Sequence, residues 1–340
     1  MKEIYKDIYK FEIPLPKSAL KEINIYVIKS EGRSLVIDTG YNNDESKKYM
    51  KENLAKIGLE IKDCDLFLTH LHADHTGLAT FFEDNGSSVY TGKKEGALIN
   101  DNTKDSYWEY FMTFPALYDM AGVLTLEDYI GHKFKLSHEL NFIGLEIGEI
   151  FKVGDYEFEV LDLRGHTPWH IGLYEKNHKF LFGGDTVLDP ITPNITFWGF
   201  EYGNILGLYI NTLKKLMTVG IDVILSSHRA PISNPNKRIS EIIYHHYLRF
   251  QEILDSMNCD RDDYTIREIS SKITWRIRAN SWEDFPIEQK WFAVGETMVH
   301  MVYLMEYGYV ECKKVGGALK FKKIKSDIME EYEEYKKGEI

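Results

Sequence analysis

Residues 69–77, Thr-His-Leu-His-Ala-Asp-His-Thr-Gly, constrain this chain more than any other part of its 340 residues. Three histidines and one aspartate fall within six positions, directly after the apolar run at residues 66–69. That run predicts a short buried strand. Burying four such polar side chains without partners would cost several kcal/mol, so packing alone does not explain the cluster. The stretch therefore predicts a site that binds metal.

The spacing within this stretch suggests how the ligands divide. Side chains alternate in an extended segment, so His70 and His72 point to the same side and can hold one ion together. Asp74 and His75 then face a second position, where the chain is expected to turn into a helix. Imidazole and carboxylate groups suit Zn²⁺ or a similar first-row ion.

Three later positions repeat the pattern of a histidine or aspartate after a predicted strand. His166 lies in a turn bounded by glycine and proline, Asp185 follows two glycines, and His228 ends the apolar segment 220–228. Glycine allows the backbone to approach a site closely. Strands that repeatedly deliver such residues at their carboxyl ends predict a layered α/β fold with a site on one rim.

The rest of the chain divides into a mixed first part and a helical last part. Residues 22–38 predict a hairpin, and residues 43–57 predict a helix. Residues 96–150 predict a helical insertion rich in aromatic side chains, which is either a satellite hydrophobic cluster or a pocket wall. From residue 238 the pattern turns helical and then predicts a small hairpin around residues 316–317, an order similar to a winged helix.

The order of these motifs resembles that of the metallo-β-lactamase-fold hydrolases: an early strand-end Asp, the motif HxHxDH, a His, an Asp and a last His. The resemblance covers about residues 10–235. It implies an αββα four-layer sandwich, here with the C-terminal helical domain that one branch of the superfamily carries. We expect a catalytic domain at residues 1–237 and a helical, winged-helix-like domain at residues 238–340.

The resemblance also implies a dinuclear metal centre. One site would contain His70, His72 and His166; the other would contain Asp74, His75 and His228, with Asp185 bridging both. Asp38, in Leu-Val-Ile-Asp-Thr-Gly, would orient the site from outside the ligand set. Because position 72 is His, a hydrolytic dizinc centre is favoured over a diiron centre of the electron-transfer branch. Two Zn²⁺ ions are expected, with Mn²⁺ or Fe as alternatives.

Such a centre predicts a hydrolase that needs no Ser or Cys nucleophile. A hydroxide bridging two ions about 3.5–4 Å apart would attack an ester, thioester or lactone carbonyl. Asp74 or a bound water would protonate the leaving group, so Asp74 and Asp38 are the predicted catalytic residues. Trp169, Phe197 and Trp198 are the predicted lining of an apolar substrate pocket, although core packing explains the last two equally well.

Composition limits the partners. The formal net charge of −12 disfavours contact with phosphate backbones, so nucleic acid is not expected as a partner. The N-terminus has no apolar signal segment, no run of about 18 apolar residues occurs, and three scattered cysteines give no disulfide framework. We therefore expect a cytoplasmic enzyme for a small molecule, with no membrane partner; the oligomeric state stays open, a homodimer included.

Two alternatives to this interpretation remain. The same metal centre could cleave phosphodiesters, which would make the chain a nuclease. The C-terminal region could instead make it a metal-binding regulatory protein, in which the centre is a relic. Binding to duplex DNA without turnover would favour the regulatory alternative.

Overall fold

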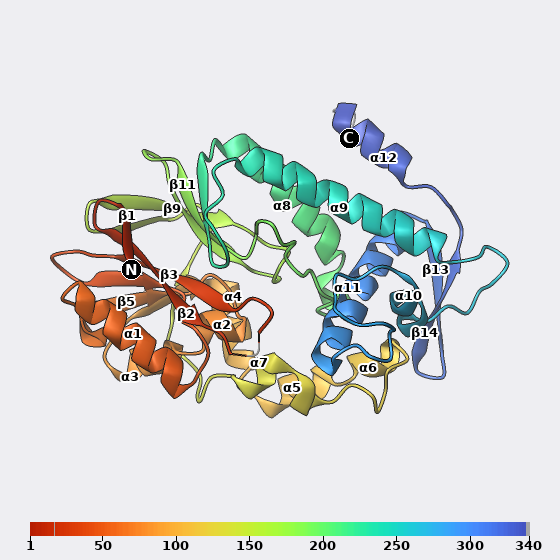
Figure 1. Cartoon of the computed structure of the whole chain (residues 1–340), viewed down its shortest axis with the longest axis horizontal. Helices are drawn as coiled ribbons and strands as arrows, with labels where there is room; N and C mark the ends of the chain where they lie inside the picture. Colours follow the sequence, from red (N-terminus) through yellow and green to blue (C-terminus); the bar gives the residue numbers. More distant parts are fainter. Residues whose placement is uncertain (17, 338–340) are drawn as a thin grey trace. The chain divides into compact units, whose positions relative to one another are not determined.

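The computed structural model describes residues 1–16 and 18–337 (Figure 1). The chain separates into two compact units. Unit 1 comprises residues 1–108, 130–193 and 214–238, and unit 2 comprises residues 109–129, 194–213 and 239–340. The expected boundary at residue 237 stays a prediction, since two earlier segments cluster with the C-terminal region.

A seven-stranded mixed sheet forms one half of unit 1. Its strands, in spatial order, are β1 (Lys2–Tyr5), β2 (Ile8–Pro14), β3 (Glu22–Ile28), β4 (Ser34–Ile37), β5 (Cys64–Phe67), β6 (Val89–Gly92) and β7 (Ile143–Leu145). Neighbours from β1 to β4 are antiparallel, and those from β4 to β7 are parallel. Parallel strands end at the same edge of a sheet, so β4 and β5 deliver the residues that follow them to one rim.

A five-stranded sheet forms the other half of unit 1. Its order is β12 (Val223–Ser226), β11 (Phe180–Gly184), β10 (Ile171–Glu175), β9 (Tyr156–Asp162) and β8 (Ile150–Val153). Side chains from both sheets share one buried core, for example Tyr26 and Phe67 from the first sheet and Phe158 and Phe182 from the second. Two sheets packed over a common core form a sandwich.

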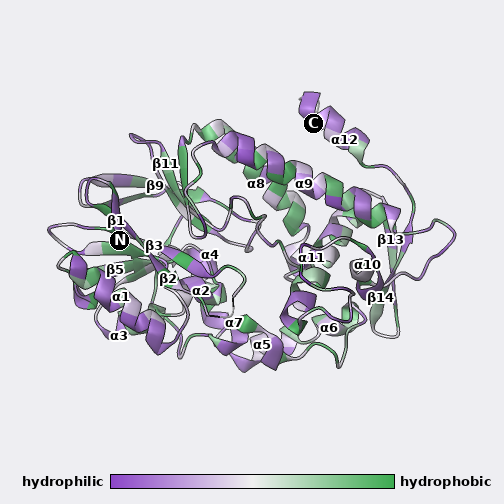
Figure 2. Cartoon of the chain, viewed as in Figure 1, coloured by the Kyte–Doolittle hydropathy of each residue, from purple (hydrophilic) through white to green (hydrophobic). Residues whose placement is uncertain are grey.

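Helices of unit 1 accompany the first sheet. They are α1 (Asp44–Lys56), α2 (Ala73–Thr76), α3 (Ala79–Asp84), α4 (Lys93–Asp101) and α7 (Ile130–Lys133), with a 3₁₀ turn at Ile61–Asp63. The Asn43 side chain caps α1 by accepting a hydrogen bond from the Ser46 backbone N–H at 2.7 Å. Figure 2 shows α1 as mostly hydrophilic, as expected for a helix with one face in water.

Unit 2 contains the helical C-terminal region that the sequence predicts. Its elements are α6 (Phe114–Leu117), α10 (Ile266–Lys272), α11 (Ile287–Glu306), β13 (Val310–Val315), β14 (Ala318–Lys323) and α12 (Met329–Lys337), with 3₁₀ turns at Leu126–Asp128 and Phe200–Tyr202. Three further helices have residues in both units: α5 (Asp105–Phe111), α8 (Ile205–Val219) and α9 (Pro235–Asp255). The hairpin of β13 and β14 turns at two glycines, Gly316 and Gly317, both with positive φ.

Within residues 1–16 and 18–337, every helix is too short or too polar to span a membrane.

Candidate active site

The predicted ligands lie together in unit 1, on segments that follow strand ends. Asp38 follows β4, residues 69–77 follow β5, His166 lies between β9 and β10, Asp185 follows β11, and His228 follows β12. The structure therefore brings all seven predicted ligands and Asp38 to one rim of the sandwich. It does so because both sheets end their site-bearing strands there.

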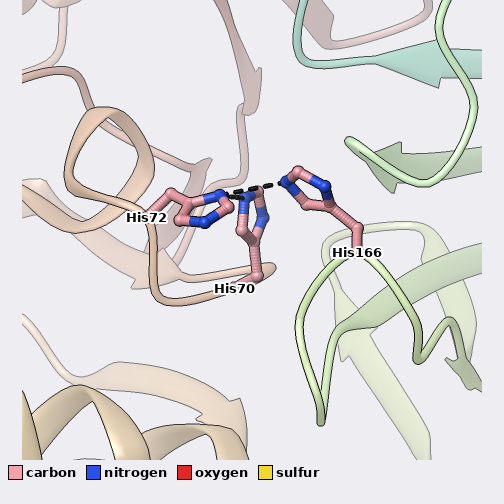
Figure 3. Close-up of side chains that lie close together, drawn as sticks. All are labelled: His70, His72 and His166. Carbon is pink, nitrogen blue, oxygen red and sulfur yellow. Dashed lines mark hydrogen bonds between the residues drawn. The ribbon is translucent and has the colours of Figure 1, made fainter. Parts of the chain in front are cut away.

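Three histidine side chains form the first group (Figure 3). The Nδ1 atom of His72 lies 3.1 Å from Nε2 of His70 and 3.0 Å from Nε2 of His166. A tetrahedral Zn²⁺ with bonds of 2.0–2.1 Å holds its nitrogen ligands roughly 3.3 Å apart. The three ring nitrogens therefore converge at a spacing that fits one ion.

A second group adjoins the first and contains carboxylates. The Nε2 atom of His228 lies 3.3 Å from Oδ2 of Asp74 and 3.4 Å from Oδ2 of Asp185. The same Asp185 oxygen lies 3.6 Å from Nε2 of His75 and 3.7 Å from Nε2 of His166. Asp185 thus lies within 3.7 Å of ring nitrogens from both histidine groups.

Several atoms in this second group are buried without a hydrogen-bond partner. Among the described residues, Nε2 of His75, Nε2 of His228 and Oδ1 of Asp185 accept or donate no hydrogen bond. Buried polar atoms are normally paired, so unpaired ones need another explanation. Because they are nitrogen and carboxylate ligands facing one another, a divalent ion fits the donor set.

The carboxylate of Asp38 links four groups around the centre, although it belongs to neither ligand group. It accepts hydrogen bonds from the Thr69 backbone N–H at 2.9 Å, the Thr69 hydroxyl at 2.9 Å and the Ser227 hydroxyl at 3.0 Å. It also pairs with Nδ1 of His75 at 2.8 Å and is fully buried. The backbone of Asp38 has φ +59°, a strained conformation for a non-glycine residue.

Hydrogen bonds to other groups orient the rings of His70 and His228. The Thr69 hydroxyl donates to Asp38, so Nδ1–H of His70 donates to that hydroxyl at 2.9 Å and leaves Nε2 toward the centre. Nδ1–H of His228 donates to the carbonyl oxygen of Glu22 at 2.8 Å. Such outer contacts fix the tautomer and orientation of a metal-binding imidazole.

The two groups differ in protonation. Burial and the neighbouring His75 hold the pKa of His70 well below its usual range, and burial with the neighbouring His166 lowers the pKa of His72 to about 3. Burial also opposes the charged form of His228, but Asp185 and Asp74 outweigh it and raise that pKa to about 10. A histidine must be neutral to bind metal, so an ion entering the second group would release protons.

Comparison with known proteins identifies the family. Residues 20–228, more than half of the chain, match the family model described as the Metallo-beta-lactamase superfamily. The chain belongs to the metallo-beta-lactamase superfamily. Its mixed α/β fold and its assignment as a hydrolase of this superfamily are thereby confirmed.

Individual members of the superfamily are similar at low identity. The hydroxyacylglutathione hydrolase GloC of Haemophilus influenzae is 26% identical over 62% of this chain and 86% of its own length. The human acyl-coenzyme A thioesterase MBLAC2 is 25% identical over 57% of this chain and 67% of its own length. The crystal structure of the metallo-beta-lactamase family protein TTHA1429 from Thermus thermophilus aligns with a TM-score of 0.78 and 25% identity, over 95% of this chain and 100% of that one.

Two glycines in these motifs, Gly77 and Gly184, lie where an added side chain would collide with neighbouring atoms. A Cβ added to Gly77 would lie 2.4 Å from the backbone N of Asn42 and 2.5 Å from the carbonyl oxygen of Gly40. Gly184 has φ +53°, and a Cβ there would lie 2.4 Å from Nε2 of His170. That His170 nitrogen accepts the Asp185 backbone N–H at 3.3 Å, so close approach at Gly184 helps to place Asp185.

The predicted substrate residues lie in different surroundings. Trp169 is half-buried in unit 1, with the Lys94 ammonium 4.1 Å from its ring centroid. Phe197 and Trp198 are buried in unit 2, where the Phe197 ring packs 5.1 Å from that of Phe114. Their role in a substrate pocket stays a prediction.

A cavity in unit 1 lies beside the first ligand group. Its lining includes Leu71 and Ala73, which flank His72, together with Ile99 and Leu136. Sequence reasoning also missed Glu95, a fully buried carboxylate near this group. An acidic residue early in a helix is ordinarily explained by the helix dipole, so the sequence offered little signal for it.

Proposed function

We propose that this chain is a dinuclear metal-dependent hydrolase that cleaves a thioester, or a related ester or lactone, at its carbonyl carbon. The position of Asp185 carries the proposal: its Oδ2 atom lies within 3.7 Å of ring nitrogens from both ligand groups. One carboxylate can therefore serve two adjacent ions. Zn²⁺ is the expected metal, and Mn²⁺ and Fe are the alternatives.

Divalent ions bound here would supply a polarised carbonyl and would lower the pKa of a coordinated water from about 15.7 to about 7. The chain's own residues supply the remaining functions. Asp74, Asp185 and the five histidines would hold the ions, and Asp38 holds His75 through Nδ1. Asp74 is 8% exposed and faces the same centre, where burial opposes its ionisation but His75 and His228 outweigh burial and lower its pKa to about 2. Its ionised carboxylate could therefore take the proton that the attacking water loses and pass it to the leaving group.

The names of similar proteins support a thioester as the substrate. One is an acyl-coenzyme A thioesterase and another a hydroxyacylglutathione hydrolase. The net charge of −12 makes a long polyanion such as RNA a poorer candidate for the same centre. A small acyl thioester therefore agrees best with the centre and the charge together.

A substrate panel on metal-defined protein tests the proposal. The full chain is stripped with a chelator, reloaded with Zn²⁺ or Mn²⁺, and assayed with an acyl-coenzyme A, a lactone, nitrocefin and a nitrophenyl phosphodiester. We expect thioester turnover that vanishes on stripping and returns on reloading. Faster turnover of the phosphodiester, lowered by salt, would favour the nuclease alternative instead.

A pair of aspartate variants distinguishes the site from the fold. Asp185→Asn should lose most metal and turnover. Asp189→Asn is the matched control, because Asp189 lies on the same loop but is 53% exposed on its side chain and faces Arg238. If Asp185→Asn kept both its metal content and its turnover, the assignment would be wrong.

A further inference from the structure

Glu95 is a buried carboxylate whose hydrogen-bond donors are neutral groups. It lies in the first turn of α4 and is 0% exposed. Its Oε1 atom accepts hydrogen bonds from the Leu71 backbone N–H at 2.8 Å and from the Thr167 hydroxyl at 2.8 Å. A carboxylate at a helix N-terminus ordinarily faces water and the helix dipole, whereas this one faces the buried segments that contain Leu71 and Thr167.

The two donors belong to the two segments that carry the three-histidine group. Leu71 lies between His70 and His72, and Thr167 directly follows His166. One of these segments follows β5 in the first sheet, and the other connects β9 to β10 in the second. A single oxygen atom therefore ties together ligand segments that are far apart in sequence and come from different sheets.

The ligand geometry needs such a tie. The nitrogens of His72 and His166 face each other at 3.0 Å, and a shift of either segment would move one of them away from a shared ion. Metal sites depend on outer contacts that hold their ligands, and loss of one such contact typically weakens binding about 10–100-fold. Asp38 fills that need for His75, to which it is hydrogen-bonded through Nδ1.

Keeping a carboxylate at this position is costly. Burial disfavours the charged form and raises the pKa of Glu95 to about 7, even though the hydrogen bonds from the Thr167 hydroxyl and the Leu71 backbone N–H oppose the shift. An apolar side chain would avoid that cost. Retaining an acid here makes sense if its hydrogen bonds do something that apolar packing cannot.

We propose that Glu95 is a positioning residue for the three-histidine metal site, which it serves by joining the His70–His72 segment to the His166 segment. The inference rests on the proposed function only in requiring that an ion binds these histidines. Glu95 does not touch the ion. It sets the distance between two of the segments that carry its ligands.

Binding of Co²⁺ and Zn²⁺ to the full chain tests this role independently of turnover. Co²⁺ binding is followed by visible absorption, which reports the ligand geometry, and Zn²⁺ affinity is measured by competition with a chromophoric chelator. Glu95→Ala removes the shared acceptor, so one of the two ions should bind about 10–100-fold more weakly, with an altered Co²⁺ spectrum. Glu95→Gln keeps a carbonyl oxygen that can accept both hydrogen bonds, so this variant should have the same metal affinity and Co²⁺ spectrum as the wild-type chain.

Two further variants keep the test decisive. Thr167→Val removes only the hydroxyl at nearly constant volume, so a smaller loss in the same ion's affinity is expected even if Glu95→Ala fails to fold. Glu175→Ala is the matched control: that carboxylate is 1% exposed and accepts hydrogen bonds from His178 at the opposite end of β10. It should lower the unfolding midpoint without changing metal affinity.

The outcomes separate this inference from the proposed function. If the wild-type chain binds two ions and Glu95→Ala and Thr167→Val bind both unchanged, the positioning role is overturned and the proposed function stands. If the wild-type chain binds no ion, the proposed function fails and the role of Glu95 fails with it. If Glu95→Gln bound metal as weakly as Glu95→Ala, this would also contradict a role that depends on the acceptor oxygen.

Discussion

Asp38→Asn should weaken metal binding although Asp38 is not itself a predicted metal ligand. Asp38 touches no ion in the proposed centre, yet it accepts hydrogen bonds from Thr69, His75 and Ser227 while fully buried. Asparagine has nearly the same shape but presents an amide in place of one carboxylate oxygen. If the asparagine oxygen keeps the hydrogen bond from the Thr69 backbone N–H, its NH₂ group replaces Oδ2 of Asp38. His75 and Ser227 both donate to Oδ2 in the wild-type chain and would then face another donor.

The magnitude follows from those lost contacts. A hydrogen bond to a charged group contributes about 1.5–3 kcal/mol, so losing two of them should lower the free energy of unfolding by about 3–6 kcal/mol. His75 would also lose the contact that directs Nε2 toward the centre. Loss of an outer partner typically weakens metal binding about 10–100-fold, which corresponds to about 1.4–2.7 kcal/mol.

Two measurements on the same preparations check these values. Zn²⁺ affinity is measured by chelator competition, and stability is measured by urea unfolding of metal-free protein. Asp65→Asn is the matched control, because Asp65 accepts hydrogen bonds from Arg33 and the Ser88 backbone N–H within the same sheet and carries no contact to the centre. Unchanged Zn²⁺ affinity in Asp38→Asn, or an equal loss in Asp65→Asn, would refute the reasoning.

Three other expectations follow from the same structure. Gly77→Ala should lower the free energy of unfolding by more than about 2 kcal/mol and reduce metal content, because its Cβ would lie 2.4 Å and 2.5 Å from backbone atoms. A variant that keeps the wild-type urea midpoint and metal content would contradict this. Burial raises the pKa of Glu296 from 4.5 to about 7 against the opposing charge of Arg249, so the folded chain binds the extra proton and stability should fall by up to about 3 kcal/mol as pH rises from 4.5 to 7. Glu296→Gln should remove that part of the slope in urea unfolding, and an unchanged slope would count against it. Chelation should lower the thermal unfolding midpoint in proportion to metal removed, and added Zn²⁺ should restore it; a midpoint indifferent to both would argue against a folded-state metal site.

The sequence predicts the part of this molecule that depends on local pattern. Residues 66–69 have the pattern of a strand, and the segment 70–75 that follows contains three histidines and an aspartate. The position of the histidines at a strand end could therefore be inferred without coordinates. His166, Asp185 and His228 also follow predicted strands, and in the structure they follow β9, β11 and β12. Strand alternation and turn residues are short-range signals, which a single sequence contains.

Contacts between distant segments could not be predicted in this way. Glu95 and Thr167 are 72 residues apart, and nothing local in either segment indicates that they meet. The hydrogen bond from the Ser227 hydroxyl to Asp38 is equally invisible, because it depends on how the second sheet packs on the first. The clustering of residues 109–129 and 194–213 with the C-terminal region is a further tertiary result that local pattern does not contain.

Titration of the metal-free chain with Zn²⁺, with bound metal and acyl-coenzyme A turnover measured on the same samples, tests the central claim most directly. We expect saturation at two ions per chain, with turnover that appears as the ions bind and is lost in Asp185→Asn. Saturation at one ion, absence of binding, or turnover that persists in the metal-free chain would contradict it.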